Sequence, residues 1–149
     1  SGHKRAQEPQ KRRTGDKKGT EETKSMDDKQ IFALCDKVRC TAWKLHCYLR
    51  HGHAEKVYEN GMVNRLRKQG IKVNPQWPIR VYDEDGTELG TFIADLLLEG
   101  ELLVEIKARP DLAREHTAQI LGYLRASSIR HGLLINFGAP QLQLRKFIL

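Results

Sequence analysis

Apolar residues recur with a helical period in the first half of the chain. From about Asp28 to Arg50 they return every three or four residues, as on one buried face of a helix. These positions are Ile31, Leu34, Val38, Leu45 and Leu49. A second helix is predicted over Ala54–Lys68, with Gly70 as its C-terminal cap. Its apolar positions are Val57, Tyr58, Met62 and Leu66.

The pattern then changes to the alternation that is typical of strands. Alternate apolar residues over Trp77–Val81 predict a strand, and Asp83–Gly86 predicts the turn that follows it. Two apolar runs, Phe92–Leu98 and Leu102–Val104, come next, and Gly100 between them supplies the positive φ of a hairpin tip. The three segments together predict an antiparallel meander.

The last part of the chain predicts one more helix and two more strands. Pro110 and Asp111 start a helix that runs to about Ala126, with Asp111 as its N-cap. The segments His131–Phe137 and Leu142–Leu149 follow as strands. The order helix, helix, three strands, helix, two strands predicts an α/β sandwich with a mixed sheet.

Two carboxylates and an amine interrupt the apolar runs of the hairpin. Asp95 lies in the first run, whereas Glu105 and Lys107 share one side of the second strand because alternate residues point to the same face. A two-residue turn would place the two acids on opposite faces. A three-residue tip that pairs Leu98 with Leu102 places Asp95 directly across from Glu105. We expect the second register.

Two carboxylates in that register suit a divalent cation. Their Cβ atoms would lie roughly 5 Å apart, and like charges so close repel each other unless a cation lies between them. Oxygen ligands on a rigid platform favour Mg²⁺ or Mn²⁺. The alternative is an ion-pair ladder on a solvated sheet face, because 30% of the residues are charged and such a spacing arises readily by chance.

The positive charge of the chain is concentrated at its start. The formal net charge is +7, and residues 1–25 carry eight basic and four acidic side chains without an aliphatic run. We therefore expect a disordered basic arm over 1–25 and a single, mildly basic domain over 26–149, which permits nucleic-acid binding. The arm suits phosphate contacts or a nuclear address, and equally a solvated linker or an extension foreign to the natural protein.

Neither a membrane segment nor a metal-binding cysteine cluster is indicated. No stretch approaches the roughly 18 apolar residues of a membrane span, so we expect an intracellular, cytoplasmic protein, or a nuclear one in a eukaryote. In the first predicted helix Cys40 and Cys47 share a stripe, but Cys35 is turned away from them. The three thiols do not converge on one ion, and we expect them to be buried or half-buried.

Polar residues are spaced one helical turn apart in the second and third helices. Glu55 and Tyr58 share one face, and Gln119 and Tyr123 lie on a stripe that also holds His116. Gln and Tyr side chains can bind a phosphate oxygen, a metal-bound water or a base without adding charge. Structural roles remain open: Glu55 as a first-turn residue favoured by the helix dipole, Tyr58 as core and Gln119 as an interior amide.

Together these motifs resemble a known family. The segment Gly52–Tyr58 matches the G-x-x-E-x-x-Y signature of the GxxExxY protein family. The hairpin with Asp95 and Glu105–Lys107 is similar to the core of the PD-(D/E)XK nuclease superfamily. The segment Gln119–Tyr123 is similar to the Q-x-x-x-Y motif of its RecB-like members, and the resemblance covers roughly residues 30 to 149.

The chain departs from the family pattern at two positions. Arg50–Gly52 replaces the Gly-Pro-Gly turn that usually precedes the glutamate helix. Ala94 stands where the name of the superfamily would place a proline before Asp95. Neither change removes a ligand, but the altered turn affects the pose of Glu55.

The resemblance implies a fold and a division of labour among the residues. The fold is an αβββαβ restriction-endonuclease-like core, with a mixed sheet flanked by helices. A Mg²⁺ or Mn²⁺ ion would be held by Asp95, Glu105, the Ile106 carbonyl and Glu55. Lys107 would orient the attacking water or stabilise charge in the transition state. The substrate would be bound by Gln119, Tyr123, Tyr58 and His116.

The function implied is metal-dependent hydrolysis of phosphodiester bonds in nucleic acid, with DNA favoured over RNA. The alternative is a catalytically silent member that binds nucleic acid or serves as a subunit of a homo-oligomer or larger assembly, because a fold does not fix a function. The joint presence of Asp95, Glu105 and Lys107 favours the nuclease, since a scaffold without catalytic demand has no physical reason to keep all three.

Overall fold

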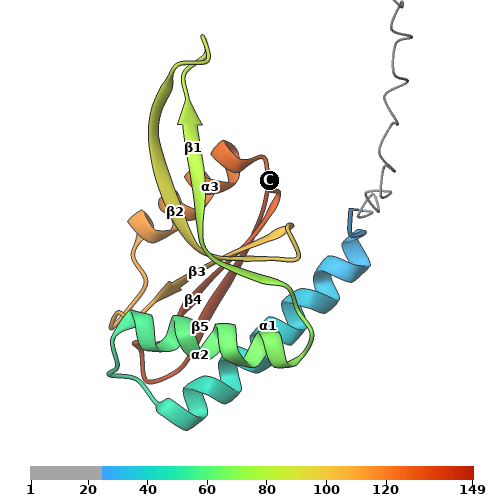
Figure 1. The fold of residues 1–149 in the computed structure, drawn as a ribbon. Helices are drawn as coiled ribbons and strands as arrows, with labels where there is room; N and C mark the ends of the chain where they lie inside the picture. Colours follow the sequence, from blue (N-terminus) through green and yellow to red (C-terminus); the bar gives the residue numbers. More distant parts are fainter. Residues whose placement is uncertain (1–24) are drawn as a thin grey trace, which may run out of the picture.

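A computed structural model describes residues 25–149 as three helices and five strands (Figure 1). The predicted basic arm covers residues 1–25, and only its last residue lies within the described part. In chain order the elements are α1 (Asp28–Leu49), α2 (Glu55–Lys68), β1 (Val73–Tyr82), β2 (Glu88–Leu98), β3 (Leu102–Lys107), α3 (Arg114–Ser127), β4 (His131–Asn136) and β5 (Gln143–Ile148). None of the described helices is long and apolar enough to cross a membrane.

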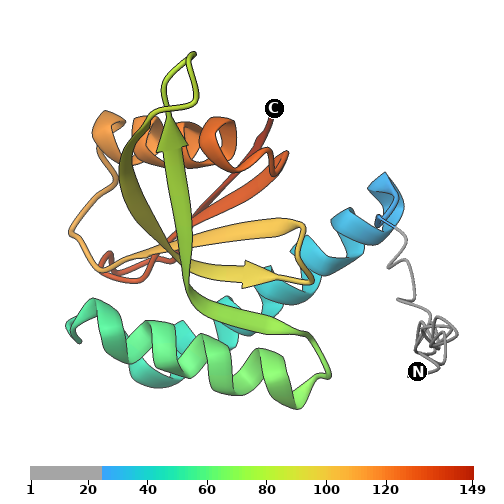
Figure 2. The same cartoon turned by 45° about the horizontal axis from the view of Figure 1, so that its top comes forward.

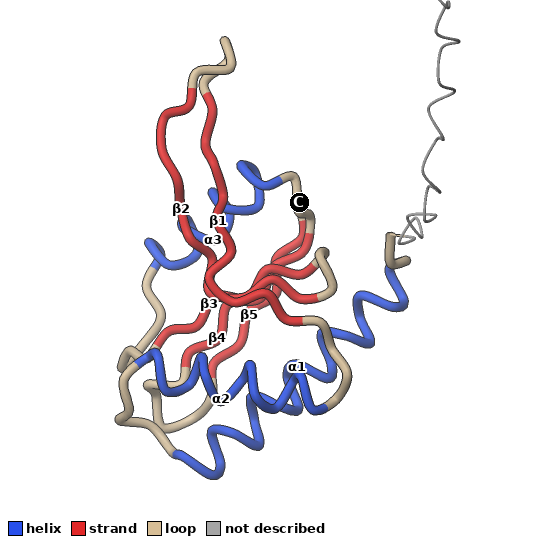
Figure 3. The backbone as a smooth tube through the Cα atoms, viewed as in Figure 1, coloured by secondary structure: helices blue, strands red, loops and turns tan. Residues whose placement is uncertain are grey.

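The five strands form one mixed sheet in the order β1-β2-β3-β4-β5 (Figure 3). All neighbours are antiparallel except β3 and β4, which run parallel and are joined through α3. A parallel neighbour requires a crossover connection, and the helix supplies it. The predicted α/β fold with a mixed sheet flanked by helices is therefore confirmed.

The helices cover the two faces of the sheet. The helices α1 and α2 lie on one face and α3 on the other, as Figures 1 and 2 show. The larger core lies under α1 and α2, where Val38, Met62 and Leu66 pack against strand residues such as Val104. A smaller core lies under α3, around Leu103 and Leu124. Residues of even number in β3 face the first core and those of odd number face α3, as a strand requires.

The hairpin between β2 and β3 has the three-residue tip that the sequence predicts. Leu98 pairs with Leu102, and the ladder continues to Leu96 opposite Val104. Gly100 has a φ of 68°, a backbone conformation that glycine adopts without steric cost. In this register Asp95 and Glu105 are the next opposed positions, so the expected register is confirmed.

The strands β1 and β2 extend beyond the sheet as a long hairpin (Figure 3). Its inner surface passes over α3, where Ile79 joins the smaller core and the ring of Phe92 lies 5.3 Å from that of Tyr123. Gln76 has a φ of 54° where the hairpin leaves the sheet, and the flanking residues Pro75 and Trp77 pair with Leu96 and Ala94. This left-handed residue marks a bend directly opposite Asp95.

Three expectations about the elements are wrong. The first strand is longer than predicted and begins at Val73, because Pro75 is tolerated on an edge strand. The third helix begins at Arg114, because the Asp111 carboxylate accepts hydrogen bonds from the Leu112 amide and the Gln143 side chain and so caps no helix. Among the thiols only Cys35 is buried, and the other two face solvent.

Candidate active site

Asp95 and Glu105 lie where the β2–β3 ladder stops. The Asp95 amide donates to Glu105 Oε1 over 2.9 Å, and the Ile106 amide donates to Asp95 Oδ2 over 2.7 Å. Each carboxylate therefore binds the main chain of the opposite strand in place of a ladder hydrogen bond. One oxygen of each group is used in this way, and the arrangement fixes the direction of the other oxygen, Asp95 Oδ1 or Glu105 Oε2.

Burial makes both groups hold their protons unusually strongly. Only 3% of Glu105 is exposed, and burial, followed by the charge of Asp95, raises the pKa of Glu105 to about 8. Burial also raises the pKa of Asp95 to about 6. The charges of Glu59 and Glu55 add to that increase, and the hydrogen bond from Ile106 opposes it. Both carboxyl groups therefore lose their protons at a higher pH than ordinary side chains of their kind.

Lys107 and Gln119 meet beside the carboxylates. Lys107 Nζ donates to Gln119 Oε1 over 2.8 Å, which joins β3 to α3. The Lys107 charge lowers the pKa of both carboxyl groups, although burial outweighs it. Tyr123, one turn after Gln119, is largely buried, and its pKa is raised by burial and then by the charge of Glu105. The structure therefore brings Gln119, Tyr123 and Lys107 to the carboxylate pair.

On α2 it is Glu59, and not Glu55, that is buried at the site. Glu55 is exposed in the first turn of the helix. Glu59 is 4% exposed and accepts hydrogen bonds from Gln76 Nε2 over 2.6 Å and Lys56 Nζ over 3.2 Å. Its charge raises the pKa of Asp95 more than that of Glu55 does. Glu59 thereby links α2 to the bend at Gln76.

Tyr58 and His116 hold the local fold together. Tyr58 has no exposed surface and stacks on Phe137, and its hydroxyl donates to the Arg50 carbonyl and accepts from the His53 amide. Tyr58 therefore supports the turn before α2, and its contact with substrate stays a prediction. His116 is buried at the start of α3, where Nδ1 accepts from the Ala113 amide and replaces the expected Asp111 cap. Burial, and then the charge of Lys107, lowers the pKa of His116.

The described residues bring together a pair of carboxylates, Asp95 and Glu105, and not a cluster of three metal-binding side chains. Within residues 25–149 no group of three or more His, Cys, Asp or Glu side chains is arranged to hold a metal ion. Glu55 is exposed at the helix start but close enough for its charge to raise the pKa of Asp95, so its role as a direct or water-mediated ligand stays a prediction. The pair still suits Mg²⁺ or Mn²⁺, since Mg²⁺ is often bound through one or two carboxylates, with water and substrate phosphate completing the shell.

Sequence reasoning missed Glu59 and Gln76. Glu59 follows Glu55 by four residues and so occupies the same face one turn further along α2, which was a usable signal. Gln76 carried no such signal, because its position depends on a bend in β1 that the alternation of apolar residues does not encode.

The comparisons with known proteins agree with this geometry. A family model described as the PD-(D/E)XK nuclease superfamily matches residues 33–147. A solved structure described as "Crystal structure of SSO0001" is similar, with a TM-score of 0.53 and 15% identity over 62% of this chain and 48% of that one. The described domain thus matches about half of the solved chain. No curated protein matches.

Proposed function

Because this chain belongs to the PD-(D/E)XK nuclease superfamily, we propose that it is a Mg²⁺- or Mn²⁺-dependent nuclease that hydrolyses phosphodiester bonds, with DNA favoured over RNA. Within the superfamily we propose the GxxExxY group, because Gly52, Glu55 and Tyr58 have the spacing of its signature. We also propose residues 26–149 as the catalytic domain. The family match covers most of that range.

One observation carries the proposal: half-buried Asp95 lies opposite buried Glu105. Each group has one oxygen bound to the main chain and both have raised pKa values, so a cation bound between them would stabilise their ionised forms. A divalent metal bound there would activate water and offset the charge that develops on the scissile phosphate. The Ile106 carbonyl, next to Glu105, is the third ligand that we propose.

The neighbouring side chains have separate tasks in this proposal. Lys107 stabilises negative charge on the phosphate, and its bond to Gln119 keeps the amine directed along the site. Gln119 and Tyr123 position the nucleotide. Glu55, exposed at the start of α2, contributes through water, whereas buried Glu59 holds Gln76 and thereby the bend opposite Asp95. His116 acts through the start of α3.

Cleavage of labelled single-stranded and duplex DNA and RNA tests this function. Cleavage should require Mg²⁺ or Mn²⁺ and stop with a chelator. The substitutions Glu105→Gln and Lys107→Met should each lower the rate about a hundredfold or more. Glu88→Gln, on the exposed part of β2, is the matched control and should keep the full rate. Equal trace activity in all four proteins would identify a contaminant and refute the proposal.

A silent scaffold is the second candidate. It is favoured by the lack of a three-ligand group in residues 25–149. It predicts that Mn²⁺ neither binds nor stabilises the protein while nucleic acid is still bound. Isothermal titration with Mn²⁺, on wild type and Glu105→Gln, separates the two candidates. Binding to wild type alone supports the nuclease.

A further inference from the structure

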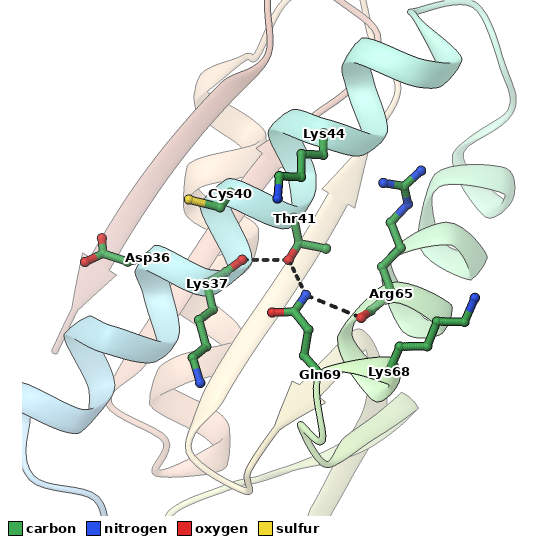
Figure 4. Close-up of a pocket in the computed structure, with 8 residues that line it drawn as sticks. All are labelled: Asp36, Lys37, Cys40, Thr41, Lys44, Arg65, Lys68 and Gln69. Carbon is green, nitrogen blue, oxygen red and sulfur yellow. Dashed lines mark hydrogen bonds between the residues drawn. The ribbon is translucent and has the colours of Figure 1, made fainter.

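A crevice between α1 and α2 lies away from the carboxylate pair, and four of its eight lining residues are cations. Its volume is about 430 Å³. Figure 4 shows the four cations around it, Lys37 and Lys44 on α1 and Arg65 and Lys68 on α2, with the ends of Lys37 and Lys68 directed outward. Gln69 donates to Thr41 and to the Arg65 carbonyl, which links the two helices at the crevice.

The positive charge of this crevice is not neutralised by the described acids. No described carboxylate lies within ion-pair distance of the four cations. Asp36 is the one acid in the lining, and it pairs with Arg39. Four like charges in one crevice repel each other in the free protein, so an anion that lies among them is attracted by all four.

The outer face of the second half of α2, next to the crevice, carries no acids. The carboxylates of α2 are Glu55 and Glu59, both in its first half. A second hollow of about 460 Å³ lies on this face and shares Lys68 with the crevice. It is lined by Asn60, Val63, Asn64, Arg67 and Lys68, so four of its five lining residues are cations or amides. Side chains of this kind contact phosphates and sugars and carry no sequence information.

The far side of the molecule has the opposite charge. The tip of the β1–β2 hairpin carries Asp83, Glu84, Asp85 and Glu88, all exposed. Phosphates are repelled from that tip and attracted to α2. Nucleic acid bound at the carboxylate pair is therefore directed over α2 rather than along the hairpin.

We propose that the outer face of α2 and the α1–α2 crevice form a binding site for the phosphodiester backbone of nucleic acid, separate from the site of cleavage. This proposal rests on the proposed nuclease function. Lys68 lies nine residues after Glu59, which is about 14 Å along the helix axis. Phosphates of one strand follow each other every 3.4 Å along duplex DNA, so the two sites are about four nucleotides apart.

Binding to labelled DNA without metal tests the proposal independently of cleavage. The variant Lys37→Gln/Lys44→Gln/Lys68→Gln removes three exposed cations of the crevice. The control Lys29→Gln/Arg125→Gln/Arg145→Gln removes three exposed cations elsewhere. Fluorescence anisotropy is measured over a range of salt concentrations in chelator, with single-stranded DNA of about 16 and about four nucleotides.

The crevice variant should bind the long DNA about a hundredfold more weakly at about 0.1 M salt. The slope of the logarithm of the binding constant against the logarithm of the salt concentration should become smaller by about 2, because each lost contact with a single strand removes about 0.7. The control should bind nearly as wild type does, and the short DNA should not distinguish the variants. Equal losses in both variants would overturn the proposal, since only overall charge would then matter. Competition by pyrophosphate as strong as by the long DNA would also overturn it in favour of a small anion.

Two further measurements separate the possible failures. If the crevice variant loses DNA binding although wild type cleaves nothing, the binding site stands and the nuclease proposal fails. If wild type cleaves and the crevice variant binds and cleaves long DNA equally well, the nuclease stands and the binding site fails. Gel filtration tests whether a second copy of the chain occupies the crevice instead. If the crevice variant loses self-association but keeps DNA binding, the crevice binds the acidic hairpin of a second copy.

Discussion

The raised pKa values of the carboxylate pair predict an unusual dependence of stability on pH. Glu105 changes from its ordinary pKa of 4.5 to about 8, and Asp95 from 3.8 to about 6. Between those values the folded chain keeps protons that the unfolded chain has lost. The free energy of unfolding must therefore fall as the pH rises from about 4 to about 8.

The size of the effect follows from the same values. One pKa unit corresponds to about 1.4 kcal/mol, so Glu105 alone accounts for a loss of a few kcal/mol above its folded pKa. Glu105→Gln keeps the acceptor for the Asp95 amide and removes the titration. We expect this variant to be about 3 kcal/mol more stable than wild type at pH 9 and nearly equal to it at pH 4.

Urea unfolding in chelator across this pH range measures the difference, with Glu88→Gln as the control that should follow wild type. Parallel curves for wild type and Glu105→Gln would refute the reasoning, because the carboxyl would then titrate alike in both states. Adding Mn²⁺ at about a hundred times its dissociation constant should restore about 2.7 kcal/mol to wild type at pH 8 and little to the variant.

Two other substitutions test the supports of the site. Tyr58→Phe should keep the stacking on Phe137 but lose the hydrogen bond to the Arg50 carbonyl. Urea unfolding should therefore show a free energy of unfolding lower by about 1–2 kcal/mol, with DNA binding unchanged. An unchanged urea midpoint would contradict that hydrogen bond. Gly138→Ala should destabilise by about 3 kcal/mol or more, because its Cβ would overlap the Arg109 main chain, whereas Gly122→Ala has open space in α3 and should be neutral or stabilising.

The sequence predicts those parts of the site that depend on local pairing. The register of Asp95 against Glu105 follows from the two apolar runs and the three-residue tip, both contained in about twenty residues. The meeting of Lys107 with Gln119 follows from the two motifs once β3 and α3 are neighbours. The order of the elements needs only the periods of the apolar residues.

The remaining features depend on tertiary contacts that periodicity does not encode. The direction of α2 against the bend in β1 decides that Glu59 and not Glu55 is buried, and that bend arises at Gln76. The start of α3 depends on the hydrogen bond between Asp111 and Gln143, two residues that are distant in the chain. The exposure of Cys40 depends on α1 having solvent on its outer side.

The hairpin that carries Asp95 and Glu105 also bears on how the chain folds during synthesis. Its two strands meet through a short loop, whereas β4 can join β3 only after α3 has been made. The apolar strands β2 and β3 are thus exposed for a time without their parallel partner. A charge within an apolar strand disfavours its pairing with another chain, and this pair supplies two. The same carboxylates therefore protect the nascent strands from aggregation before any substrate is met.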